Sequence, residues 1–329
     1  MSAAPVLAIV GPTATGKTAL AVEISRRLGG EVVSMDSRQA YRGMAVGTAA
    51  PTTEEMAAAR HHGVCFLPPE SRYSAGEFAR LARGWIADIR SRQNAPLLVG
   101  GTGFFLRALL SPVFREPPMD PVRRERLHEW LREKPRGQVR RWALLLDRRL
   151  GDRLATVDWQ RATRTIELAW LSGRPLSWWQ EHGEPEATPV HATVVALRLP
   201  AEDHRQRIRD RLAASWGAWV DEVRALLPGR SDSHAPGWSA VGYRELAAWL
   251  DDCGSDSDAI RTGPGSADDE MDVRRTIEHA TWQYARRQRT WFRHQLPEST
   301  VWLDARRPTG QLADRIEEEL SRAGAPAPS

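Results

Sequence analysis

The feature that most constrains this chain of 329 residues is a glycine-rich turn near its start. The run from Val6 to Val10 is continuously apolar, as is typical of a strand buried in a parallel sheet. A helix is expected from about Thr18 to Leu28, and the turn between them has the spacing GxxxxGKT: Gly11, Pro12, Thr13, Ala14, Thr15, Gly16, Lys17 and Thr18. Strand, turn and helix in this order predict a P-loop, whose backbone N–H groups bind phosphate.

Two side chains of this loop indicate what it binds. Only two of the 46 basic residues are lysines, Lys17 and Lys134, so the chain uses arginine wherever a general cation suffices. A lysine retained in the P-loop supplies a compact, mobile charge for phosphate. The Thr18 hydroxyl is placed to bind a magnesium ion. The loop alone does not distinguish a nucleotide from another diphosphate.

Apolar runs and helical stretches alternate through the first third of the chain and again near its end. Strands are expected at 31–35, 64–67, 97–99, 193–199 and 301–303. Helices are expected at 75–92, 201–227, 241–250, 272–294 and 309–322, with a solvated loop at 251–272. This order predicts an α/β fold, a P-loop NTPase-like parallel sheet flanked by helices, with its site at the carboxyl ends of the strands.

The amino-acid composition changes after residue 114. Between Arg115 and Arg164, thirteen arginines and one lysine face eight carboxylates, a local excess of +6, and the rest of the chain sums to about −2. The segment is helix-forming, which predicts a P-loop core in 1–114, a helical arginine-rich insertion in 115–190 and a return to the core in 191–329. Concentrated basic charge suits a polyanionic partner. A solvated helical surface is the alternative.

Polar clusters follow two of the expected strands. Asp36 begins the first and can bind magnesium through water or accept a proton from a nucleophile, although an Asx turn would also explain it. The second is Gly100, Gly101, Thr102 and Gly103. A P-loop NTPase commonly has a metal-binding carboxylate after a central strand. Its absence here weakens an ATPase interpretation, and a tight turn would explain the glycines alone.

An ordered series of motifs from about Val6 to Arg293 resembles the tRNA dimethylallyltransferase family. Besides the P-loop, these motifs are Asp36 to Tyr41, Gly47-Thr48 with Pro51, Tyr73 to Ala75, Val99 to Leu106, Asp158 to Arg161 with Arg164 and Glu167, Gly242 to Glu245, and Tyr284 to Arg293. The resemblance implies transfer of a dimethylallyl group from its diphosphate to N6 of the adenosine on the 3′ side of the anticodon. It also implies tRNAs that read codons beginning with U, and release of diphosphate.

The same resemblance implies roles for individual residues. The P-loop from Gly11 to Thr18 would bind diphosphate, with magnesium near Thr18. Asp36 would be the general base for the adenine N6, and Thr102 would lie at the reaction centre. The helical insertion would grip the anticodon arm of tRNA. The implied tRNA contacts are Asp36, Ser37, Arg38, Gln39, Thr102, Arg124, Gln160, Arg161, Ala162, Thr163 and Arg164.

Four positions depart from the family pattern. Ala50 replaces a lysine, Cys65 an aspartate, Phe105 a tyrosine and Trp282 an arginine. The first two remove polar groups near the cleft and would lower activity or alter the substrate. Three alternatives stay open: a P-loop small-molecule kinase, a weakened paralogue that binds tRNA without modifying it, and a prenyltransferase acting on free adenine nucleotide.

Composition also predicts where the protein is located and which structural cross-links it lacks. No apolar run reaches the roughly 20 residues that span a membrane, so a cytoplasmic protein without a signal peptide or membrane partner is expected. The two cysteines, Cys65 and Cys253, lie far apart and form no CxxC pair, which argues against zinc or a disulfide framework. A monomer suits a protein that must surround an RNA stem.

Overall fold

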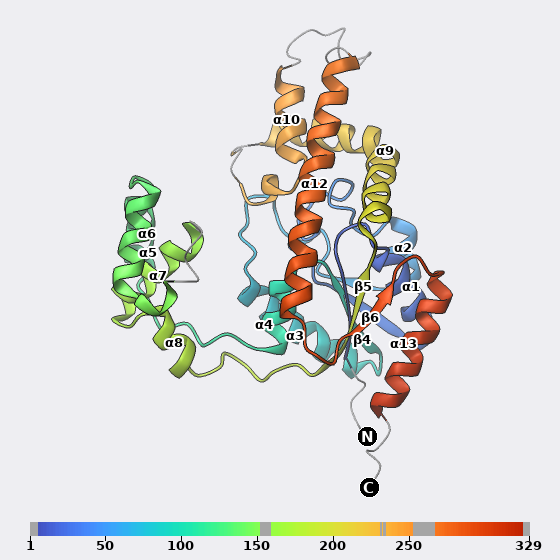
Figure 1. The fold of residues 1–329 in the computed structure, drawn as a ribbon, viewed down its shortest axis with the longest axis horizontal. Helices are drawn as coiled ribbons and strands as arrows, with labels where there is room; N and C mark the ends of the chain where they lie inside the picture. The colour runs from blue at the N-terminus through green and yellow to red at the C-terminus, as the bar shows by residue number, and fades with distance from the viewer. Residues whose placement is uncertain (1–5, 152–158, 231, 233–234, 253–266, 325–329) are drawn as a thin grey trace. The chain divides into compact units, whose positions relative to one another are not determined.

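The computed structural model describes residues 6–151, 159–230, 232, 235–252 and 267–324. Their contacts define two compact units (Figure 1). Unit 1 comprises the chain up to Leu110 and from Val190 onwards, and unit 2 is Ser111–Pro189. Whether the units match the domains expected at 1–114, 115–190 and 191–329 stays a prediction. Among the described residues, none of the helices is both long and apolar enough to cross a membrane.

Unit 1 is built on a six-stranded sheet in the order β3-β2-β4-β1-β5-β6, with every neighbouring pair parallel. The strands are β1 Val6–Val10, β2 Gly30–Ser34, β3 His61–His62, β4 Ala95–Gly100, β5 Ala192–Arg198 and β6 Val301–Asp304. This confirms the predicted α/β fold class. Val10 pairs in register with Gly100, so the P-loop and the Gly100–Gly103 loop leave neighbouring strands at the same edge of the sheet.

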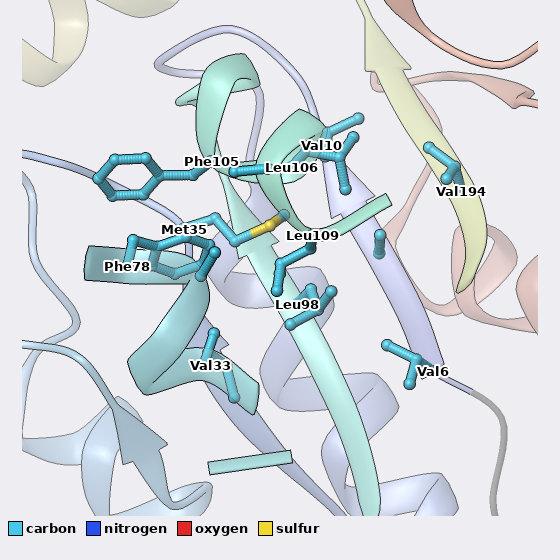
Figure 2. Packing of buried hydrophobic residues seen from close by; sticks show 14 of the residues in the cluster. Val6, Val10, Val33, Met35, Phe78, Leu98, Phe105, Leu106, Leu109 and Val194 are labelled. Carbon is cyan, nitrogen blue, oxygen red and sulfur yellow. The ribbon is translucent and has the colours of Figure 1, made fainter. Parts of the chain in front are cut away.

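Alternate residues of each strand face opposite sides of the sheet and bury two apolar layers. On one side, Val6, Val10, Val33, Met35 and Leu98 pack against α3 (Ala75–Ser91) and α4 (Gly103–Leu110). Figure 2 shows Phe78 of α3 with Phe105, Leu106 and Leu109 of α4 in this layer. On the other side, the strands pack against α1 (Lys17–Leu28) and α13 (Thr309–Gly324).

Three further helices build a third apolar cluster beside the strand-end loops. They are α9 (Ala201–Leu226), α10 (Tyr243–Asp252) and α12 (Ala267–Gln295). Trp216 and Trp219 of α9 pack with Tyr243 of α10, and Met44 joins them from the loop that follows β2. That loop ends at the short helix α2 (Thr53–Ala58), which is closed by a capping box of Thr52 and Glu55. The cluster therefore fixes α9 and α12 against the loops that carry the predicted site.

Unit 2 is helical, with α5 (Pro121–Arg132), α6 (Arg136–Leu146), α7 (Trp159–Ser172) and α8 (Leu176–His182). Its own core is small and apolar, built from Leu127, Leu131, Val139, Ala143, Ala162 and Ile166. The entering and leaving segments are tied together by backbone hydrogen bonds from Arg115 N–H to Glu184 O (2.7 Å) and from Glu186 N–H to Val113 O (2.9 Å).

Two sequence-based expectations are wrong in detail. The strand expected at 64–67 is absent: the edge strand is His61–His62, and of the expected residues only Leu67 forms a bridge, to Tyr41. Cys65 has φ of 48°, a left-handed conformation that breaks a strand. The loop expected at 251–272 is helical at both ends, because α10 extends to Asp252 and α12 begins at Ala267. Its centre, residues 253–266, lies outside the described residues.

Candidate active site

The P-loop has the backbone that a phosphate cradle requires. Gly16, which precedes α1, has φ of 84°, and Ala14 is also left-handed at φ of 60°. A Cβ on Gly11 would lie 2.9 Å from the Leu197 carbonyl oxygen, so a side chain is excluded there. The Lys17 ammonium folds back over the loop and donates to Pro12 O at 2.8 Å. Loop amides, a helix N-terminus and an ammonium thus converge on one point.

Lys17 is a poorly solvated cation. Burial lowers its pKa from 10.5 to about 8, the Asp36 carboxylate partly opposes that shift, and the Arg211 guanidinium adds to it. Arg211, on α9, also has a pKa lowered by burial. Neither cation forms an ion pair of 4 Å or less within the described chain. Two desolvated cations without a carboxylate partner are suited to an anionic ligand that carries more than one charge.

Asp36 and Thr102, predicted separately, are brought together at the strand ends. The Thr102 hydroxyl accepts a hydrogen bond from Ser37 N–H at 3.1 Å, and Thr102 N–H donates to Met35 O at 3.1 Å. Asp36 accepts from Arg38 N–H at 2.9 Å, which is the Asx turn considered as the alternative. The turn uses one carboxylate oxygen and fixes the direction of the other.

A cavity of about 230 Å³ lies beside these residues in unit 1. Predicted site residues Thr13, Asp36 and Arg38 line it, and they are joined by a set of residues that the sequence interpretation did not single out as site residues: Gly47, Thr48, Arg211, Trp219, Ser239, Ala240, Val241, Thr281, Tyr284 and Arg287. Burial raises the pKa of Tyr284, and the nearby Asp36 carboxylate adds to that shift, so the phenol stays protonated and can donate. The cavity therefore connects Thr13 of the P-loop with Asp36.

Side chains of α9 and α12 hold the tip of the P-loop. Arg211 donates to the Thr13 hydroxyl at 2.7 Å, and a His204 ring nitrogen lies 2.8 Å from Thr13 O. The buried Gln288 amide accepts from Thr13 N–H at 2.9 Å and donates to Gly101 O at 2.9 Å. A single amide thus links the loops after β1 and β4. Sequence reasoning missed Arg211 because α9 carries several arginines and no motif marks one of them.

Thr18 is the residue of the P-loop whose side chain suits a magnesium ion. Among the described residues no cluster of three or more His, Cys, Asp or Glu could hold a metal by itself. Thr18 is half-buried in the first turn of α1, and its hydroxyl has no hydrogen-bond partner in the part of the chain that the structure describes. Magnesium commonly takes one or two protein oxygens together with phosphate oxygens and water, and Thr18 can supply one of these.

The tRNA contacts expected in the insertion lie on α5 and α7 of unit 2. Arg124 and Arg164 both pair with the buried Glu167, Arg124 at 3.1 Å, and Arg164 also pairs with Glu116 at 2.6 Å. His128 completes this group, 2.5 Å from Glu167. The carboxylates fix the direction of both guanidiniums and neutralise part of their charge.

The run from Gln160 to Arg164 contains both exposed and buried residues. Gln160 and Arg161 are exposed at the start of α7. Ala162 is buried in the unit 2 core, and the buried Thr163 donates its hydroxyl to Trp159 O at 2.9 Å. In unit 1, Gln39 is also committed internally, because its amide donates to Ala49 O at 2.8 Å. These three expected tRNA contacts support the fold around the surface; whether any of them also contacts tRNA stays a prediction.

The departures from the family pattern have distinct surroundings. Phe105 is buried and stacked on Phe78 with centroids 4.3 Å apart, so the core accepts a ring without a hydroxyl. Trp282 is nearly buried, has the Arg205 guanidinium 4.7 Å from its ring, and belongs to the small cluster that touches Ala14 of the P-loop. Ala50 donates its N–H to Ala45 O at 2.8 Å, closing the turn beyond Thr48. Burial raises the pKa of the Cys65 thiol, which disfavours a thiolate there.

Fold and site together define a P-loop α/β protein with an inserted helical unit, in which an aspartate lines a cavity beside the glycine-rich loop. Two family models match the chain: IPP transferase over residues 39–295 and isopentenyl transferase over residues 4–65. The chain is 35% identical to the tRNA dimethylallyltransferase of Syntrophobacter fumaroxidans, over 95% of this chain and 87% of that protein. It is 39% identical to the one of Halorhodospira halophila, over 89% and 91%. The chain belongs to the IPP transferase family of tRNA dimethylallyltransferases.

Two solved structures resemble this chain in fold. A tRNA isopentenylpyrophosphate transferase from Bacillus halodurans matches with TM-score 0.65 and 26% identity over 97% of both chains. A eukaryotic dimethylallyltransferase acting on tRNA matches with TM-score 0.80, over all of this chain and 82% of that one. At 20% identity the second likeness concerns the fold alone.

Proposed function

We propose that this protein transfers the dimethylallyl group of dimethylallyl diphosphate to N6 of the adenosine on the 3′ side of the anticodon, in tRNAs that read codons beginning with U. Family membership supports prenyl transfer to tRNA. The observation that carries the proposal is the cavity on which the P-loop residue Thr13, the unpaired cation Arg211 and the carboxylate of Asp36 converge. That arrangement pairs a site for a leaving diphosphate with a base for an amine.

The P-loop side of the cavity would stabilise the leaving group. As the bond between the allylic carbon and the ester oxygen breaks, negative charge accumulates on the diphosphate. Lys17, Arg211 and the N-terminus of α1 are already in place and poorly solvated, so they stabilise that charge with little rearrangement. Magnesium near Thr18, when bound, would neutralise further charge on the phosphate oxygens.

The acceptor side would position the amine and remove its proton. N6 forms a bond to the allylic carbon while the carbon–oxygen bond breaks, and the proton of N6 passes to the Asp36 carboxylate. Tyr284 lines the cavity together with Asp36, and Thr102 accepts from the N–H of the adjacent Ser37. These two residues would hold the amine in line with the allylic carbon. Because an adenine in a stacked loop cannot reach such a cavity, the base has to flip out of the anticodon loop.

The remaining contacts would hold the anticodon arm. Arg38, with its guanidinium fixed by Ser239 at 2.7 Å and by Pro236 O at 3.0 Å, lines the cavity. Arg124, Arg161 and Arg164 of unit 2 would bind phosphates or bases of tRNA. We propose a monomer that acts in the cytoplasm, where unmodified tRNA is available.

A labelling experiment tests the proposal. The protein is incubated with radiolabelled dimethylallyl diphosphate, magnesium and unmodified tRNA, and the label is followed in RNA and in digested nucleosides. Label on the adenosine beside the anticodon is expected for the wild type, and its rate of incorporation is expected to be strongly reduced for Asp36→Asn.

Three outcomes separate the alternative functions. Absence of RNA label together with ATP-dependent phosphorylation of a metabolite would indicate a small-molecule kinase. Label that excess AMP diverts from tRNA would indicate a free-nucleotide acceptor. Tight binding of tRNA without turnover would indicate a weakened paralogue.

A further inference from the structure

We propose that Trp219 closes the far end of the cavity and limits the prenyl group to five carbons, so that it is a specificity-determining residue for the length of the prenyl donor. The inference rests on the proposed function and adds a residue to it. Trp219 lies on α9, eight residues beyond Arg211, in the same cavity wall. That separation corresponds to about 12 Å along the helix axis.

The helix orients the donor within the cavity. Arg211 is fixed to the P-loop by its hydrogen bond to the Thr13 hydroxyl, so the diphosphate end of the cavity lies there. Trp219 lies about two turns further along the same helix and lines the same cavity. A donor with its diphosphate at Arg211 therefore directs its tail at the indole.

Two glycines make room for this indole. A Cβ on Gly47 would lie 2.1 Å from the indole nitrogen, and a Cβ on Gly242 would lie 2.2 Å from the six-membered ring. The Gly47 loop is itself held in place, since Glu222 accepts hydrogen bonds from Val46 N–H at 2.7 Å and Gly47 N–H at 3.1 Å. The Tyr243 hydroxyl donates to the same carboxylate at 2.6 Å. The wall is therefore rigid on both sides of the ring.

The surroundings of Trp219 are suited to an alkyl group and unsuited to a base. The neighbouring lining residues Ala240 and Val241 have no polar side-chain atom. The hydroxyls of Thr48 and Thr281 donate inside the chain, to Met44 O at 2.5 Å and to Ile277 O at 2.8 Å, so neither has a proton left to donate to a ligand. A flipped adenine needs partners for its ring edges. Neither of these two hydroxyls can donate to a ring nitrogen of such a base.

The indole N–H supports a steric role. It is buried and has no hydrogen-bond partner within the described residues. The N–H of a tryptophan in a core usually has a hydrogen-bond partner. Here the ring is present although its N–H has no such partner. We conclude that the size of the ring at this place is what the site uses.

The test compares two donors. Transfer to unmodified tRNA is measured with dimethylallyl diphosphate and with geranyl diphosphate, and mass spectrometry of the nucleosides identifies a five-carbon or ten-carbon product. For Trp219→Ala and Trp219→Leu, we expect the ratio of kcat/KM for geranyl to that for dimethylallyl diphosphate to rise at least about tenfold, because single methylenes change discrimination by this order. Trp216→Leu is the matched control: Trp216 has the same exposed fraction, 5%, on the same helix, but does not line the cavity.

A second variant tests the wall from the opposite direction. Val241→Phe fills the tail end, so it is expected to lower kcat/KM for dimethylallyl diphosphate at least about tenfold while leaving the Kd for tRNA unchanged. An unaltered donor ratio in both Trp219 variants, or a Val241→Phe variant with normal donor kinetics, would overturn the inference. A raised KM for tRNA with an unchanged donor ratio would assign this end to the base instead. If the wild type itself fails to prenylate tRNA, the proposed function fails first, and the two failures are thus distinguished.

Discussion

The two units use positive charge in opposite ways. Unit 2 contains the segment with a net excess of +6, but Arg124 and Arg164 are paired there with Glu167 and Glu116. Unit 1 holds Lys17 at the P-loop and Arg211 in the cavity wall, with no ion pair of 4 Å or less to either in the described residues. Net charge along the sequence therefore locates a surface that can attract RNA. The chemistry depends on a few desolvated charges that the net charge does not reveal.

The largest effect is expected from substituting Asp36, the carboxylate whose charge acts on both Lys17 and Arg211. Asp36→Asn keeps the shape and the Asx turn but cannot take up the proton of N6. We expect kcat to fall by roughly 10²- to 10⁴-fold, the usual range for a general base. The Kd for tRNA, measured by filter binding, is expected to stay within a few-fold of the wild type. Normal turnover in Asp36→Asn would remove the base from the mechanism.

The next largest effect is expected at Arg211. Arg211→Gln removes the guanidinium that holds Thr13 and faces the cavity, and kcat/KM for dimethylallyl diphosphate should fall by roughly 10²- to 10³-fold. Arg211→Lys keeps the charge and loses the planar geometry, so it should recover part of the activity. Arg209→Gln is the control, because Arg209 is exposed on the same helix and does not line this cavity. Equal losses of kcat/KM in Arg209→Gln and Arg211→Gln would mean that the total charge of the helix, and not the position of Arg211, determines activity.

The amino-acid sequence was sufficient to predict those elements that a local pattern of apolar residues marks. The strands β1, β2, β4 and β5 were predicted because strands buried on both faces are continuously apolar. The edge strand His61–His62 has no apolar signal, and the neighbouring apolar residues were mistaken for it. Asp36 and Thr102 could be expected near the P-loop because parallel strands end at one edge of a sheet.

Residues contributed by distant helices could not be predicted in the same way. Amphipathic spacing shows which face of α9 is buried, but not that Arg211 lies at the P-loop while Arg209 is exposed. Gln288 lay within the motif Tyr284 to Arg293 with no role assigned to it. Its function as a link between Thr13 and Gly101 depends on contacts across 275 and 187 residues. Such contacts are set by tertiary packing, which no short window of sequence contains.

A moderate effect is expected from pH, through Lys17. Its pKa of about 8 in the free protein is lowered by burial, so the side chain is charged below that pH and loses its charge as the pH rises through it. The logarithm of kcat/KM for dimethylallyl diphosphate should therefore fall with slope −1 above about pH 8, roughly tenfold per pH unit. Bound diphosphate stabilises the ammonium, so kcat at saturation should stay flat to a higher pH. A profile of kcat/KM that is flat to pH 9.5 would contradict the depressed pKa.

The smallest effect is expected where unit 2 neutralises its own arginines. Glu167→Gln removes the buried charge that fixes Arg124, Arg164 and His128. Breaking a fully buried pair costs about 3–5 kcal/mol. Because Arg124 and Arg164 are 42% and 31% exposed, solvent screens them and a loss of roughly 1–2 kcal/mol in the stability of unit 2 is expected. At saturating tRNA the kcat should be unchanged, since unit 1 supplies the cavity.

The KM for tRNA in Glu167→Gln then decides between two roles for that carboxylate. If Glu167 mainly positions the guanidiniums, KM should rise by a few-fold although the protein has gained a positive charge, because the arginines lose their fixed direction. If it mainly weakens them as RNA ligands, KM should fall and the dependence on salt should steepen, since more phosphate charge is neutralised on binding. We expect the rise, because both arginines bind the one buried oxygen, Oε1, and so share a single anchor.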